Sequence, residues 1–280
     1  MDLTVTAMVL FAALLHAGWN AVYKGRGSGL ATGVLITIGM GGTSALLLPF
    51  LPIPDPASWK FLAASIALHI CYRIFLAASY RYGDLGQIYP ISRGMGPLLV
   101  TIIGFFWLGE KLPVQVLLGI LVVIIGITSL AFRGNTVSVF HTARPVLLAI
   151  GTGIFIAGYT ITDGLGARLA GSPHGYIIWL MFVDALIFVP IIGYLRREKI
   201  RAFAVKDWLI GLACGIAALI AYWLFVWAMT LAPIAPAAAL RETSVIFAAL
   251  IGAIFLKESF GRWRITAAVI VTVGVVLMRF

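Results

Sequence analysis

Long apolar runs separated by short breaks fill the chain from end to end. Each run has roughly 20 residues, the length that an α-helix needs to cross the hydrocarbon core of a bilayer. The runs are Leu3–Tyr23, Leu30–Leu51, Trp59–Tyr80, Gly86–Leu108, Pro113–Phe132, Pro145–Leu165, His174–Leu195, Trp208–Leu231, Pro233–Leu256 and Trp263–Phe280. The sequence therefore predicts an all-α polytopic membrane protein with ten transmembrane helices.

The composition agrees with this prediction and limits the kinds of partner and cofactor that we expect. Hydrophobic residues make up 62% of the chain, charged residues only 11%, and the mean hydropathy is +1.07. The net charge of +10 would suggest a nucleic-acid partner in a soluble domain, but here most basic residues lie in the breaks and are interpreted as topology signals. Cys71 and Cys214 lie inside apolar runs without metal-ligand spacing, so no metal and no cofactor is predicted. No basic stretch precedes the first run, which we expect to be a retained helix rather than a signal peptide.

The two halves of the chain share a spaced pattern of residues. Members of each matching pair are separated by the same 148 positions. The pairs are Arg93 and Arg241, Gly104 and Gly252, Glu110 and Glu258, and Gly126 and Gly274. We predict a first five-helix repeat over residues 1–135 and a second over residues 145–280. Because each repeat holds an odd number of helices, the second would enter the membrane from the opposite side, which gives inverted repeats.

Lys and Arg residues are unevenly divided between the two predicted sides of the membrane. Most lie in the loops of one side, which includes the basic break at 196–206. The other side holds only Lys60, Lys111, Arg168 and Arg279. Because basic loops stay in the cytoplasm, this bias predicts a multi-pass protein of the bacterial inner membrane with both termini on the periplasmic side.

A turn followed by a glycine-rich last helix closes each half. The turns read Leu108-Gly109-Glu110-Lys111 and Leu256-Lys257-Glu258-Ser259. With this arrangement the chain resembles the EamA family of the drug/metabolite transporter superfamily, and it is similar to bacterial amino-acid exporters of that superfamily. The resemblance implies a secondary transporter with a central cavity lined by the first, third and fourth helices of each repeat. The segment 16–20, HAGWN, also resembles EamA proteins associated with phosphonate use.

Polar residues share one face of the first helix of each repeat. His16, Trp19 and Asn20 follow the spacing of three and four residues that places side chains together on a helix, and Tyr159 and Asp163 do so in the second repeat. Ionisable groups within a bilayer are costly and usually functional, so these residues are candidates for lining a cavity that binds substrate. The alternative is that they only hydrogen-bond between helices.

The third and fourth helices supply the remaining candidates. Tyr72 and Tyr222 could pack a flat or apolar part of a substrate, or belong to an interfacial aromatic belt. Arg93 and Arg241 match between the repeats, and a guanidinium suits a substrate carboxylate or phosphonate. They could instead extend to the membrane surface. Glu242 could pair with Arg241, although adjacent residues of a helix do not face each other.

Coupling to an ion gradient needs a titratable group inside the membrane. Asp163 is the first candidate for binding a coupling proton, followed by His16, Asp184 and Glu242, while exchange and facilitated diffusion stay open. Glu110 and Glu258 stand just before the last helix of their repeats, so capping of those helices explains them.

Together these features predict a transporter rather than an enzyme. We expect a monomer that moves a small metabolite, an amino acid such as an aromatic or hydrophobic one, outward by alternating access. The alternative substrates are phosphonates or other organic anions. A passive channel is less favoured because inverted repeats with charges near the middle of the membrane suit a gated carrier. A membrane enzyme is disfavoured because the sequence holds no HxxxH, DxxD, CxxC or GxSxG arrangement.

Overall fold

The structure is a computed structural model that describes residues 1–24, 29–82, 85–132, 143–255 and 262–278. All regular elements in these ranges are helices. The helices of the first half are α1 (Leu3–Lys24), α2 (Leu30–Leu47), α3 (Trp59–Tyr82), α4 (Leu85–Phe106) and α5 (Val114–Ser129). Those of the second half are α7 (Ala143–Leu169), α8 (Pro173–Leu195), α9 (Arg197–Arg201), α10 (Val205–Leu231), α11 (Ile234–Arg241), α12 (Ser244–Phe255) and α13 (Arg262–Leu277).

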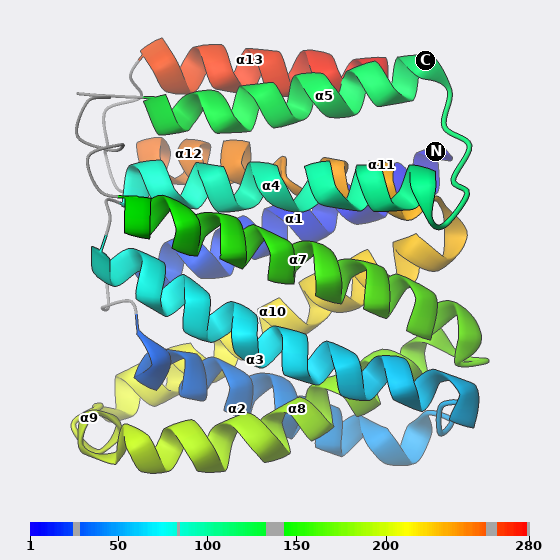
Figure 1. The fold of residues 1–280 in the computed structure, drawn as a ribbon. Coiled ribbons are helices and arrows are strands. Elements are labelled where there is room, and N and C mark those ends of the chain that lie inside the picture. Colours follow the sequence, from blue (N-terminus) through cyan, green and yellow to red (C-terminus); the bar gives the residue numbers. More distant parts are fainter. Residues whose placement is uncertain (25–28, 83–84, 133–142, 256–261, 279–280) are drawn as a thin grey trace.

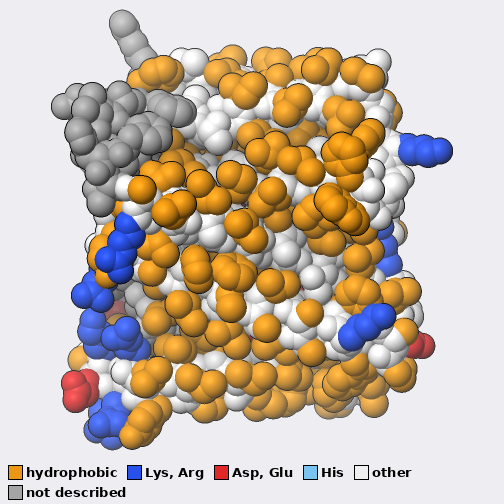
Figure 2. Space-filling model, in the orientation of Figure 1, with side chains coloured by type: hydrophobic (Ala, Val, Ile, Leu, Met, Phe, Trp, Pro, Cys, Tyr) orange, Lys and Arg blue, Asp and Glu red, His pale blue; other side chains and the backbone are white. Residues whose placement is uncertain are grey.

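The predicted membrane character is confirmed. Within the described ranges, eight segments are long and apolar enough to cross a bilayer, and Val114–Ser129 and Trp263–Leu277 are shorter apolar helices. Hydrophobic side chains cover most of the face shown in Figure 2, and Lys and Arg gather toward the two ends of the helices. The chain is a multi-pass membrane protein.

The structure differs from the sequence prediction at two places in the second half. The predicted helix over Pro233–Leu256 is interrupted, because α11 ends at Arg241 and α12 begins at Ser244. The basic break at 196–206, read as a loop, contains the short helix α9. By contrast, α4 is continuous through Pro90 and Pro97.

The helices lie side by side in one bundle, with α5 and α13 at one edge and α2 and α8 at the opposite edge (Figure 1). Helices α1, α3, α4, α7 and α10 to α12 fill the space between these two pairs. The start of α1 and the end of α13 lie at the same end of the bundle, and α9 lies at the other end. The middle of the bundle is thus formed by α1, α3 and α4 from the first half and by α7, α10 and the pair α11 and α12 from the second.

Contacts between α5 and α13 are reciprocal. A Cβ atom added to Gly126 would lie 2.7 Å from a methyl carbon of Val271, and one added to Gly274 would lie 2.7 Å from a methyl carbon of Val123. Both the glycines and the valines are matching pairs, separated by 148 positions. Glycine allows such close approach of helices inside a membrane. The two helices therefore meet through the same residues of the repeat pattern.

Candidate functional site

The interruption between α11 and α12 brings two neighbouring side chains to one point. The amide of Glu242 donates to the carbonyl of Ala239 (3.1 Å), and the amide of Val245 donates to the carbonyl of Glu242 (3.0 Å), so the regular helical hydrogen bonding lapses here. The hydroxyl of Thr243 donates to the carbonyl of Leu240 (2.8 Å). Because the helix ends at Arg241, the rule that adjacent helical residues face apart does not hold at this position.

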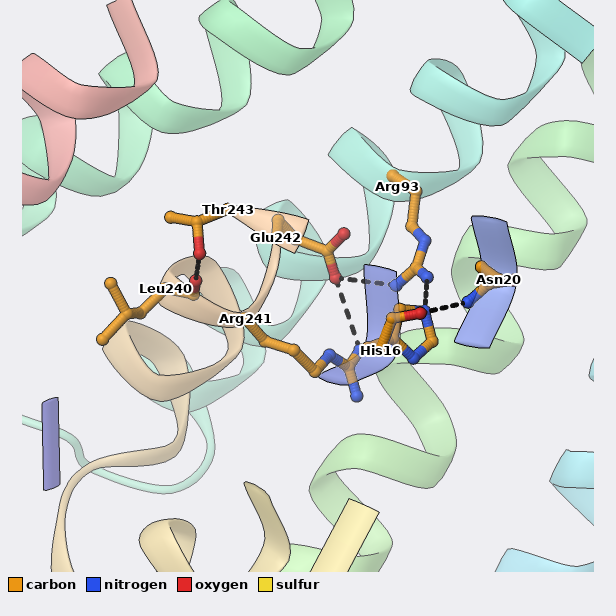
Figure 3. Close-up of polar contacts among 7 residues, drawn as sticks. All are labelled: His16, Asn20, Arg93, Leu240, Arg241, Glu242 and Thr243. Carbon is orange, nitrogen blue, oxygen red and sulfur yellow. Dashed lines mark hydrogen bonds and ion pairs between the residues drawn. The ribbon is translucent and has the colours of Figure 1, made fainter. Parts of the chain in front are cut away.

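Glu242 stands between the two repeat-matched arginines (Figure 3). Its Oε1 accepts from Nη1 of Arg93 on α4 (3.2 Å) and from Nη2 of Arg241 on α11 (3.4 Å). All three residues are buried, with relative exposures of 4% for Arg93, 6% for Arg241 and 0% for Glu242. The repeat pattern predicted both arginines, and the structure joins them through one carboxylate.

His16 of α1 completes this charged cluster, which consists of His16, Arg93, Arg241 and Glu242. Its Nε2 makes a short hydrogen bond with Nη2 of Arg93. Because a guanidinium can only donate, Nε2 must accept, so His16 is neutral and carries its proton on Nδ1. Two guanidinium cations therefore face one carboxylate within the described part of this cluster.

Two buried polar atoms of the charged cluster have no hydrogen-bond partner among the described residues. They are Nε of Arg241, a donor, and Oε2 of Glu242, an acceptor, and both are buried. Buried polar atoms in native proteins are nearly always paired, so each exception needs an explanation. A bound molecule that offers one acceptor and one donor would satisfy both.

Aromatic rings surround the two guanidinium groups. The guanidinium carbon of Arg241 lies 4.2 Å from the ring centre of Phe225 and 5.9 Å from that of Tyr159, and that of Arg93 lies 5.2 Å from the ring centre of Tyr89. Cations over aromatic faces at such distances are attracted by the ring quadrupole. The charged cluster is therefore bounded by flat apolar surfaces.

A second polar group, the tyrosine–aspartate network, contains the buried residues Asp163 and Tyr176 and the half-buried Tyr222. Asp163 on α7 is fully buried and accepts from the hydroxyl of Tyr176 on α8 (3.1 Å) and, through a short hydrogen bond, from that of Tyr222 on α10. A Cβ atom at Gly166 would lie 2.5 Å from the Tyr176 hydroxyl oxygen. The absence of a side chain at Gly166 thus leaves the space through which Tyr176 reaches the carboxylate.

Tyr159 links the charged cluster to the tyrosine–aspartate network. Its ring stacks on His69 of α3, with ring centres 4.2 Å apart, and meets Tyr72 edge-on at 5.6 Å. Tyr222 lies 6.3 Å from the same ring, measured between centres. Tyr159 also contacts Arg241, as given above. Residues from α3, α7, α10 and α11 therefore form one continuous polar and aromatic region, in which His69, Tyr72 and Tyr222 are half-buried.

The predicted site residues lie near this region in three groups. His16, Arg93 and Arg241 belong to the charged cluster, and Asp163, Tyr159, Tyr72 and Tyr222 belong to the network and its link. The last group lies beside His16: Trp19 meets its ring edge-on at 5.2 Å, and the Asn20 amide donates to its carbonyl at 2.7 Å. The amide group of Asn20 is thus engaged by its own helix.

The sequence did not suggest Tyr176 as a site residue, nor that Glu242 binds both arginines. Tyr176 lies shortly after the tight turn that joins α7 to α8, and Asp163 lies shortly before it. A short connection makes neighbouring helices antiparallel, so residues near the turn on either side can meet, and this signal could have suggested the pair. No spacing rule indicates the helix interruption that frees Glu242.

A separate ion pair lies between α3 and α8. Nη2 of Arg73 makes a short contact with Oδ1 of Asp184, and Nη1 lies 3.4 Å from the hydroxyl of Thr37 on α2. The guanidinium carbon also lies 3.9 Å from the ring centre of Phe188. Asp184, a candidate for ion coupling from the sequence, is thus paired with a cation that joins three helices.

The prediction that Glu110 caps the helix that follows it is wrong. Its Oε1 accepts from the amide of Ile234 (2.6 Å) and its Oε2 from the amide of Ala235 (3.2 Å), so Glu110 caps the start of α11 in the other half of the chain. The start of α5 has no side-chain cap. The matching residue Glu258 lies outside the described residues. A carboxylate at this position satisfies two free amides and interacts favourably with the positive end of α11.

Replacing Glu110 with alanine is expected to lower the free energy of unfolding by about 1 kcal/mol, the usual effect of losing a helix cap. Glu110→Gln keeps an acceptor and should lose less. Titration of the purified proteins with denaturing detergent measures both changes. Equal stability of wild type and Glu110→Ala would show that solvent replaces the cap.

Comparisons with known proteins agree with a helical membrane carrier. An all-α multi-pass chain with buried charges at an interrupted helix has the features of a membrane transporter. Residues 143–280 match the family model described as "EamA-like transporter family". Residues 143–280, the second half of the chain, therefore belong to this family, which is part of the drug/metabolite transporter superfamily and indicates a membrane transporter.

The fold is shared with solved structures. Twenty-two chains match, and one of them, described as "Crystal structure of protein", has a TM-score of 0.80 and 16% sequence identity. The match covers 99% of this chain and 98% of that one. At this identity the likeness concerns the fold alone. A search of the curated proteins returned no match.

Proposed function

We propose that this protein is a secondary transporter that carries an amino acid outward across a bacterial inner membrane. The observation that carries the proposal is the pair of unsatisfied atoms in the charged cluster. A substrate carboxylate can accept from Nε of Arg241, and an α-ammonium can donate to Oε2 of Glu242. A phosphonate or organic anion without an ammonium group would leave Oε2 unpaired.

The surrounding rings support a substrate with an aromatic or hydrophobic side chain. The ring of Phe225 and the ring of Tyr159 face Arg241. The ring of Tyr89 faces Arg93, and the ring of Tyr72 packs against Tyr159. Such rings offer apolar faces, and tyrosine adds a hydroxyl for a polar substituent. The charged head group and the apolar side chain of one amino acid would thus contact different parts of the same region.

For the architecture we propose ten crossings in two inverted repeats, over residues 1–135 and 145–280. The eight long spans together with α5 and α13 support this count, and the reciprocal contacts of Gly126 and Gly274 support the symmetry. A helix interrupted beside a central site is a recurring feature of transporters that work by alternating access. One chain of this size can enclose the site, so we propose a monomer.

For the orientation we propose that the end carrying α9 faces the cytoplasm and that both termini face the periplasm. Helix α9 and its flanks include Arg196, Arg197, Lys199 and Arg201. Both terminal helices have their outer ends at the opposite end of the bundle (Figure 1). The positive-inside rule favours this orientation.

Asp163 is our candidate for binding a coupling proton. It is fully buried, and in the described structure its carboxylate bonds to two tyrosine hydroxyls and to no cation. The groups that face it are Tyr176 from α8, Tyr222 from α10, and Ser65 and His69 from α3. A carboxylate without a fixed cationic partner is free to exchange a proton during transport.

Uptake of a panel of labelled amino acids into proteoliposomes, with and without a pH gradient, tests the proposal. We expect saturable uptake and counterflow by the wild type, and stimulation by the gradient if a proton is coupled. Arg241→Ala should abolish uptake because the carboxylate loses its donor. Arg144→Ala, which removes an exposed arginine at the start of α7, is the matched control and should transport normally.

The outcomes are distinct. No uptake of any amino acid by folded wild-type protein would contradict the amino-acid proposal and direct attention to organic anions. Normal uptake by Arg241→Ala would remove this arginine from the binding site. Flux without saturation or counterflow would indicate a channel.

A further inference from the structure

We propose that Glu242 limits the charged cluster to head groups with a single anionic group, so that a second anionic group on the ligand is rejected. This inference rests on the proposed transport function and names a residue that sets the charge of the substrate. It concerns the difference between two similar ligands, which a purely structural role of Glu242 would not affect.

The described charges of the cluster sum to one positive charge. Arg93 and Arg241 are both buried, and His16 is neutral because its Nε2 accepts from Arg93. Glu242 compensates one of the two cations, so one positive charge is left for the ligand. Uncompensated charge inside a membrane is costly, and a ligand with one carboxylate and no ammonium group removes it, whereas a zwitterionic amino acid leaves it unchanged. A dianion would replace an excess positive charge by an excess negative one.

One guanidinium nitrogen of Arg241 is a donor without a partner among the described residues. Glu242 accepts from Nη2 of Arg241 and leaves Nε of the same guanidinium without a partner among the described residues. In Figure 3 the Glu242 carboxylate lies between Arg93 and Arg241, so its Oε1 occupies the position that a second anionic group would need to reach both arginines. One anionic group can therefore bind at Arg241, and a second finds its position already taken.

The charged cluster is asymmetric at a position next to the matching arginines of the two halves. The counterpart of Glu242, 148 positions earlier, is Gly94. A Cβ atom at Gly94 would lie 2.3 Å from a methyl carbon of Thr128, so the first half has no room for an acidic side chain at this position. The two halves supply one arginine each, but only the second supplies a carboxylate. Among the described residues, Glu242 is therefore the acidic residue that sets the charge presented by the arginine pair.

The experiment compares two probes that differ by one carboxylate, 3-phenylpropionate and 2-phenylsuccinate. Their dissociation constants are measured at pH 7.5 with purified protein in detergent. We expect the wild type to bind 3-phenylpropionate at least about tenfold more tightly than 2-phenylsuccinate. Glu242→Gln adds one positive charge to the cluster and should reverse this preference, so that 2-phenylsuccinate binds more tightly.

Two further variants control the result. Glu242→Asp retains the carboxylate and should keep the wild-type preference. Glu110→Gln removes a carboxylate outside the charged cluster, at the start of α11, and should also keep it. If Glu242→Gln does not fold, the wild-type preference and its retention in Glu242→Asp still test the proposal.

Two results would overturn the inference: a wild type that binds 2-phenylsuccinate as tightly as 3-phenylpropionate, or a folded Glu242→Gln protein with an unchanged ratio. Either could occur while amino-acid uptake is normal, in which case only this inference fails. Conversely, a reversed ratio in a protein that transports no amino acid would support Glu242 as the charge filter and reject the amino-acid proposal.

Discussion

The Asp184→Ala variant is expected to lose about 3–5 kcal/mol of its free energy of unfolding, because the substitution leaves the Arg73 guanidinium inside the membrane without a counterion. The carboxylate of Asp184 is nearly fully enclosed, with a side-chain exposure of 6%. After the substitution the described residues offer Arg73 the hydroxyl of Thr37 and the ring of Phe188. Neither carries a charge that could replace the carboxylate. Titration of the purified protein with denaturing detergent measures the loss.

A double variant distinguishes the effect of losing the ion pair from the effect of leaving Arg73 without a counterion. Arg73→Met combined with Asp184→Leu removes both charges and fills similar volume, and such replacements are often neutral or stabilising. We therefore expect the double variant to be more stable than Asp184→Ala alone. A single variant within about 0.5 kcal/mol of the wild type, the range of ordinary surface substitutions, would mean that the pair does not hold α3 to α8.

Asp163→Ala is expected to destabilise the protein less but to change transport more. Two tyrosine hydroxyls lose their acceptor, and hydrogen bonds inside membranes contribute on average about 0.6 kcal/mol each and at most about 1.7. The expected loss is therefore about 1–3 kcal/mol. If Asp163 binds the coupling proton, any stimulation of uptake by a pH gradient should disappear. Detergent unfolding and proteoliposome uptake measure the two effects.

Asp163→Asn is the matched variant. Asparagine keeps an oxygen that accepts from one tyrosine, so this variant should be more stable than Asp163→Ala. It has no titratable carboxyl, so it should lose the gradient response equally. A gradient response that survives in folded Asp163→Asn would assign the coupling proton elsewhere, with His16 or His69 as the next residues to test.

The helices were predictable because each needs a long apolar run, and a run of that length has few other uses. Arg93 and Arg241 could be identified as a matching pair for a different reason: the constant offset of 148 positions assigned them equivalent places in two copies of one pattern. That both bind one carboxylate was not predicted and comes from the structure. The length of an apolar run and the offset between matching residues can both be read from the sequence without knowledge of the fold.

The interruption after Arg241 was not predictable in the same way. The segment 234–255 is uniformly apolar apart from a few polar residues, and no glycine or proline stands at the point where the helix ends. Ion pairs of Glu242 with two arginines accompany the turn, and one of those arginines comes from a distant helix. The partner of Glu110 was likewise not predictable from local sequence. Local spacing suggested the nearest helix start as its partner, but tertiary packing placed the start of α11 within reach instead.

Helix α11 has a further consequence for how the molecule divides into moving bodies. Its eight residues are fastened at the beginning by Glu110 and at the end by the link from Glu242 to Arg93, and both anchoring residues belong to the first half of the chain. A rocking motion that preserves these contacts must carry α11 along with the first half, although its sequence lies in the second. In the alternating-access motion that we propose, the boundary between the two moving bodies would then run through Thr243, between α11 and α12, rather than through the connection between the two proposed repeats.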